Sequence, residues 1–180
     1  MDPQRLVEQL PLVEKWIDAL LERHRTSATS VASLPFAHLA DFYRPDTLRA
    51  AHVVLVDQVP TPPLTALGLP EFAAFEHMQA DGITYRDTFF VTRGHADEES
   101  LHFHELVHIV QWRLLGPTHF LLAYAAGLAT PEGYSSNPLE LIAYGLQEHF
   151  EKGASFRAEP LIEQHLRSAV PALLRPFNRG

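Results

Sequence analysis

Apolar residues recur at helical spacing along the first part of the chain. Residues 5–25 carry an apolar stripe on one side, which predicts an amphipathic helix. The stripe consists of Leu6, Leu10, Val13, Ile17, Leu20 and Leu21. Pro11 lies within it, so we expect a kink or a division into two helices there. Further short helices are predicted over residues 36–43 and 69–78.

Short β-branched and aromatic runs predict strands. The clearest covers residues 51–59 and stops at Pro60, which begins a proline-rich connector. Two more runs, residues 83–85 and 88–92, flank Arg86-Asp87 and predict a hairpin or one long bent strand. From these segments we expect a small antiparallel sheet.

The second half of the chain is dominated by helical patterns with clear ends. Residues 101–115 predict one helix, with Asp97 as its cap and Gly116-Pro117 as its end. Residues 118–128 predict another, and Asn137-Pro138 opens a helix that runs to about residue 151. Residues 160–169 predict a last helix. The fold class is therefore α+β and predominantly helical, in a single domain over residues 1–180.

Composition restricts the possible binding partners and the expected cellular compartment. The chain has 180 residues, 46% of them hydrophobic, with a net charge of -8 and no cysteine. Without a basic stripe, nucleic acid is a poor partner, and without cysteine, disulfides and thiolate zinc sites are excluded. No signal peptide and no membrane-spanning run is recognisable, so we expect a cytoplasmic protein with no membrane partner.

The sequence His104-Glu105-Leu106-Val107-His108 is an H-E-x-x-H pattern in the middle of the predicted helix 101–115. Residues i and i+4 of a helix lie on one face, so both imidazoles can hold one Zn²⁺ ion. Glu105 lies about 100° round the axis, where its carboxylate can act as a general base instead of a ligand. The alternative interpretation is a pair of histidines that bind no metal.

A third ligand must come from elsewhere, because the positions three and six after His108 are Gln111 and Leu114. Glu140 is our candidate: it is a lone carboxylate among apolar residues on the helix that Asn137 caps. The competing interpretation is a solvent-facing glutamate that complements the helix dipole. Gln111 shares the metal face and either orients a ligand or packs.

Two tyrosines are candidates for stabilising a developing oxyanion, Tyr134 in a loop and Tyr144 one turn after Glu140. For each of them, a simple packing role is the alternative.

The two motifs together, His104-Glu105-x-x-His108 and Asn137-Pro138-x-Glu140, resemble those of the gluzincin metallopeptidases, above all small bacterial members with an Asn-Pro-x-Glu ligand helix. The likeness covers residues 82–151 and implies a minimal zincin-like domain. It implies His104, His108 and Glu140 as zinc ligands and Glu105 as the general base. It further implies that the strand Phe89–Thr92 is the edge to which a peptide pairs. We expect a catalytic core over residues 81–155, an N-terminal extension over 1–80 and a C-terminal helix and tail over 156–180.

The expected function is hydrolysis of a peptide or protein substrate by a zinc-bound water that Glu105 activates. One alternative is a non-catalytic metal-binding or latent protease-fold module, in which residues 1–80 cover the cleft. Another is a helical bundle that uses three histidines for different chemistry.

Overall fold

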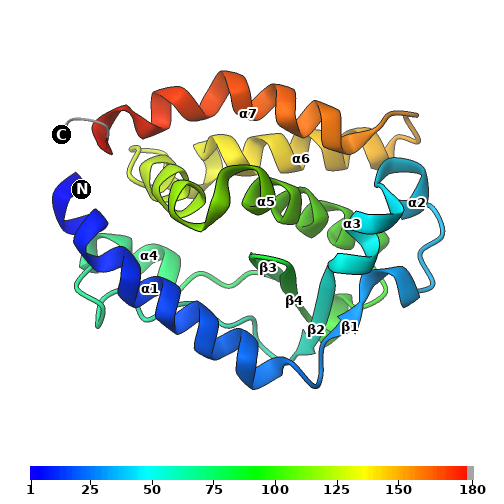
Figure 1. The fold of residues 1–180 in the computed structure, drawn as a ribbon, viewed down its shortest axis with the longest axis horizontal. Helices are drawn as coiled ribbons and strands as arrows, with labels where there is room; N and C mark the ends of the chain where they lie inside the picture. Colours follow the sequence, from blue (N-terminus) through cyan, green and yellow to red (C-terminus); the bar gives the residue numbers. More distant parts are fainter. Residues whose placement is uncertain (178–180) are drawn as a thin grey trace.

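The computed structural model describes residues 1–177, and Figure 1 shows their arrangement. The helices are α1 (Pro3–His24), α2 (Leu39–Phe42), α3 (Pro45–Ala50), α4 (Ala73–Glu76), α5 (Glu99–Leu128), α6 (Pro138–Glu151) and α7 (Ala158–Leu174). The strands are β1 (Thr29–Ser30), β2 (His52–Val56), β3 (Gly82–Tyr85) and β4 (Thr88–Thr92). Short 3-10 turns cover Val31–Ser33, Pro70–Phe72, Arg93–His95, Gly133–Ser136 and Arg175–Phe177. The fold is α+β and mostly helical, as the sequence predicts.

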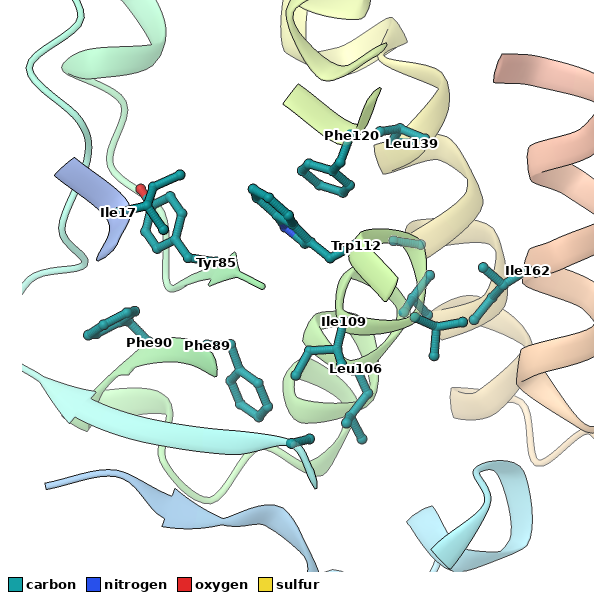
Figure 2. Close-up of a cluster of buried hydrophobic side chains, with 14 of the residues drawn as sticks. Ile17, Tyr85, Phe89, Phe90, Leu106, Ile109, Trp112, Phe120, Leu139 and Ile162 are labelled. Carbon is teal, nitrogen blue, oxygen red and sulfur yellow. The ribbon is translucent and has the colours of Figure 1, made fainter. Parts of the chain in front are cut away.

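Helix α5 is the centre of the molecule, with α6 and α7 on one side and the sheet and α1 on the other (Figure 1). Its first half is buried all round, with Phe103, Leu106 and Val110 fully inaccessible. Figure 2 shows Tyr85 and Phe89 of the sheet on one side of α5 and Ile162 of α7 on the other. A helix buried on every side is held rigidly, which suits a helix that carries functional side chains.

The sheet is mixed, which corrects the expected antiparallel arrangement. Its strand order is β1-β2-β4-β3, and β2 pairs with β4 in parallel, with His52 opposite Thr88. Parallel pairing needs a crossover of a dozen or more residues, and the segment between β2 and β4 supplies one. β3 and β4 form the predicted hairpin, closed at Arg86, whose φ is 58°.

The strand order also corrects the expected edge. Residues Phe89–Thr92 belong to β4, which has neighbours on both sides, so no peptide can add to it. The edge next to α5 is β3 instead. A continuous apolar run such as 89–91 is typical of an inner strand that is covered on both faces, and all three residues are fully buried.

Helix ends differ from the predictions in a few places. α1 continues through Pro11, because the carbonyl that loses its hydrogen-bond donor belongs to Val7, an exposed residue. α5 begins at Glu99 with Glu98 at its cap position, so the Asp97 cap was wrong. The break at Gly116 is confirmed, with φ 72° and ψ 164°. α7 is longer than predicted at both ends and runs through Pro171.

No helix within residues 1–177 combines the length and the apolar character that crossing a bilayer requires.

Candidate metal centre

Three buried side chains from two helices converge on one point. His104 and His108 project from one face of α5, and Glu140 projects from the first turn of α6. Their exposed fractions are 4%, 5% and 3%. One ligand atom from each lies within 4.8 Å of the others, which makes this trio a group that could hold a metal ion.

The separations of these atoms fit a tetrahedral ion. The Nε2 atoms of His104 and His108 are 3.1 Å apart. They lie 3.4 and 3.5 Å from the nearer oxygens of Glu140, Oε2 and Oε1 respectively. Two ligand atoms that each sit 2.0–2.1 Å from a tetrahedral zinc ion are about 3.3 Å apart. The two histidine nitrogens and the carboxylate are thus close enough to share one small metal ion.

A glutamine orients each histidine. Gln111 Oε1 lies 2.9 Å from His108 Nδ1, and Gln147 Oε1 lies 3.0 Å from His104 Nδ1. A carbonyl oxygen only accepts, so each Nδ1 donates and each Nε2 of a neutral imidazole keeps a lone pair. This is the tautomer that a metal ligand needs, and outer partners of this kind fix ring orientation. Gln111 therefore orients a ligand, the first of the two roles considered for it.

Two tyrosines hold the carboxylate of Glu140. Tyr124 donates to Oε1 at 2.5 Å, and Tyr134 donates to Oε2 at 2.8 Å. Burial and the Glu140 charge raise the pKa of both phenols, so both keep their protons and remain donors. The ligand carboxylate is thereby fixed from two sides.

The start of α6 places Glu140 in the centre. Asn137 accepts from the Leu139 N–H at 3.1 Å, as expected of a cap, and donates to the Tyr124 carbonyl at 3.2 Å. Gly127 allows this approach, because a Cβ there would overlap the Asn137 side chain. Gln111 also donates to the Leu139 carbonyl at 3.0 Å. These bonds join the first turn of α6 to α5.

The Glu105 side chain faces the edge strand β3. Thr84 Oγ1 donates to its Oε2 at 2.6 Å. Gly82 lies against the same carboxylate, and a Cβ at that position would overlap Oε1. Burial raises the pKa of Glu105 against the opposing effects of His104 and His108. A carboxyl with a raised pKa is a better proton acceptor than an exposed one.

The cluster as a whole favours a positive charge. Burial alone would lower the pKa of His108, but Glu140 outweighs it and raises that pKa to about 9. Burial would likewise raise the pKa of Glu140, but the facing histidines hold it well below its usual value. Without a metal ion, protonated His108 is the cation that the buried carboxylate needs; a bound metal ion would take over that role and displace the proton.

A cavity adjoins this cluster. Its volume is about 100 Å³, and both histidines, Glu105 and Glu140 lie in its wall. Most of the remaining wall is apolar and comes from α1, the 62–78 connector, β3 and the second half of α5. The site therefore borders a mostly apolar space.

All the predicted site residues lie in one region, with different exposures. Tyr134 and Tyr144 have hydroxyls 3.3 Å apart, and the Tyr144 ring lies 4.5 Å from the His104 ring. Tyr144 is 49% exposed, so its hydroxyl is the more accessible one. His102 points elsewhere, to the Ala96 carbonyl, as its helical position predicts.

Sequence reasoning missed four residues of the site: Gly82, Thr84, Tyr124 and Gln147. Gln147 had a usable signal, since it lies seven residues after Glu140 on the same face of α6. Tyr124 had no local signal, because its partner Glu140 comes from another helix. Thr84 and Gly82 had no local signal, since their role depends on which strand forms the edge.

Comparison with known proteins finds no match: no family, no curated protein and no solved structure is similar to this chain.

Proposed function

We propose that the protein is a zinc-dependent metallopeptidase with a zincin-like core of the gluzincin type. The observation that carries this is the combination of the converging His104, His108 and Glu140 with a second carboxylate, Glu105, that is held beside them by Thr84. A purely structural metal site has no need of that extra carboxylate, whose burial is costly.

His104, His108 and Glu140 would hold the zinc ion, which would supply a water of lowered pKa, about 7, and polarise the substrate carbonyl. Glu105 accepts the water's proton at its carboxylate and passes it to the leaving amine. Thr84 keeps Glu105 in place through Oε2, which leaves Oε1 for the proton transfer. Tyr134 and Tyr144 offer hydroxyls where negative charge develops on the substrate oxygen, and Tyr144 is the more accessible donor.

A peptide substrate would pair with β3. The Thr84 carbonyl accepts from the Trp112 indole at 3.2 Å, so it points away from β4, and by alternation the backbone of Gly82 points away as well. Gly82 is thus the free backbone position next to Glu105. Strand addition there would bring a peptide bond to the catalytic carboxylate.

The experiment combines metal analysis with two variants. Purified wild type should contain one zinc per chain and cleave an unstructured protein such as casein. Glu105→Gln should keep the zinc and lose cleavage, whereas Glu140→Gln should lose zinc affinity. Wild type without stoichiometric zinc would overturn the metal assignment.

The nearly complete burial of the ligands also suits a non-catalytic metal module. That alternative gains support if wild type and Glu105→Gln bind zinc with the same affinity and wild type cleaves no peptide in a mixed library.

A further inference from the structure

The cavity beside the metal centre extends far beyond the ligands. One end holds Glu105, Glu140 and the histidines, and the opposite wall is formed by α1 and the 62–78 connector. Leu6, Leu10 and Val13 contribute from α1, and Phe72 and Met78 contribute from the connector. None of these residues belongs to the segment 82–151 that carries the metal site, so this wall is a feature of the N-terminal extension.

Charge is confined to the metal end of the cavity. No lysine or arginine lines it among residues 1–177, and its only carboxylates are Glu105 and Glu140. A charged group that entered the N-terminal part would lose its hydration and find no partner. An apolar group would instead exchange water for aliphatic and aromatic contacts.

Contacts between α1, the connector and the β3–β4 hairpin fix the wall of the cavity, so it is not a packing defect. Arg5 of α1 bonds Glu71 of the connector at 2.7 Å. Asp18 bonds Arg86 of the hairpin at 2.8 Å, and Trp16 packs edge-on against Tyr85 with centroids 5.6 Å apart. The cavity holds about 100 Å³, several times the roughly 10–15 Å³ that one buried water needs, so it has room for a small apolar group.

We propose that this cavity binds an uncharged apolar side chain of the substrate, next to the amide bond that lies at His104, His108 and Glu140. The N-terminal extension then determines specificity and is not merely a cover. The cleavage of the neighbouring amide bond rests on the proposed peptidase function. The binding of the apolar group does not.

Binding can be tested without catalysis, by calorimetry of the full-length protein with butanamide, hexanamide and octanamide, which have no chelating group. Affinity should rise about fourfold for each added methylene, and 8-aminooctanamide, whose cation would lie in the apolar part, should bind at least tenfold more weakly than octanamide. An affinity independent of chain length would overturn the proposal, whether or not the protein proves to be a peptidase.

Two variants locate the binding. Ala125 lines the cavity, and its neighbour Ala126 on the same helix does not. Ala125→Leu should weaken octanamide at least tenfold, while Ala126→Leu should leave it unchanged. If Ala125→Leu does not fold, Leu6→Ala serves instead, because enlarging the cavity should move the best-binding chain towards decanamide. Equal effects at 125 and 126, or no shift for Leu6→Ala, would refute the location.

A further experiment with substrates tests whether the apolar group is a peptide side chain or an acyl chain. Peptides with leucine or phenylalanine at the cleaved bond should be hydrolysed in preference to those with alanine or lysine. Preferential hydrolysis of N-octanoyl amides over these peptides would contradict a side-chain pocket.

Discussion

Gly82→Ala is the sharpest single test of the site, because it moves the proposed base without touching a ligand. A Cβ at position 82 would lie 2.9 Å from Glu105 Cδ and 3.1 Å from Cγ. Carbon atoms in contact sit about 3.5–4.0 Å apart, so the carboxylate must retreat by roughly 0.5–1 Å. A misplacement of about 1 Å can reduce catalysis about 100-fold, or about 2.7 kcal/mol in the barrier.

The assay is kcat/KM for a fluorogenic peptide, with zinc content measured on the same samples. Gly82→Ala should lose about two orders of magnitude in rate, in line with the same displacement argument, while zinc stays stoichiometric. Gly94→Ala is the matched control, since a Cβ there has no atom within 4 Å. Activity of Gly82→Ala within threefold of wild type would refute the placement of Glu105.

A double-mutant cycle tests the same overlap without catalysis. In urea unfolding, Gly82→Ala should change the free energy of unfolding more unfavourably in wild type than in the Glu105→Ala background. The coupling should fall at about 0.5–3 kcal/mol, the range for residues in contact. The entropic effect of replacing glycine is common to both backgrounds and cancels. Strict additivity would show that the two side chains do not meet.

Three further predictions follow from other parts of the structure. Gln111→Leu and Gln147→Leu should each weaken zinc about 10–100-fold in chelator competition, because each removes the acceptor that orients a histidine. Phe103→Ala should destabilise the fold by about 3–5 kcal/mol in urea unfolding, since the ring is fully buried and stacked on Phe150. Burial would raise the pKa of Glu159, but its hydrogen bonds and the facing arginine lower it from 4.5, so its stabilisation is complete above that value. Stability should therefore fall as the pH drops through the lowered folded pKa, and Glu159→Gln should show a smaller acid loss.

Much of the candidate metal cluster could be anticipated from local rules. The i, i+4 spacing places His104 and His108 on one face wherever the helix lies. The Asn137-Pro138 pair marks the start of a helix and places Glu140 in its first turn. Only a short connection separates this turn from the end of α5. Both signals are properties of a few consecutive residues, and the structure brings the three side chains together as they suggest.

The edge strand could not be anticipated in this way. Residues 82–85 and 88–92 both have strand composition, and the hairpin is compatible with either of them at the edge. The choice depends on β2, which pairs with β4 in parallel from more than thirty positions away and leaves β3 exposed to α5. Thr84 and Gly82 meet Glu105 only as a result of that pairing.

The chain's own pattern, then, is sufficient for the shared face of His104 and His108, the position of the proposed base and most helix boundaries, since these follow from periodicity, caps and breakers over a few residues. It left open whether Glu140 faces the histidines or solvent, and the packing of α6 on α5 decides this. Tertiary structure alone decides the partners of those groups: Tyr124 on Glu140, Gln147 on His104, Thr84 on Glu105, and the wall that α1 contributes to the cavity. These contacts join residues from separate elements, and their geometry is set by which surfaces become buried together around α5. Local propensity carries no information about that choice.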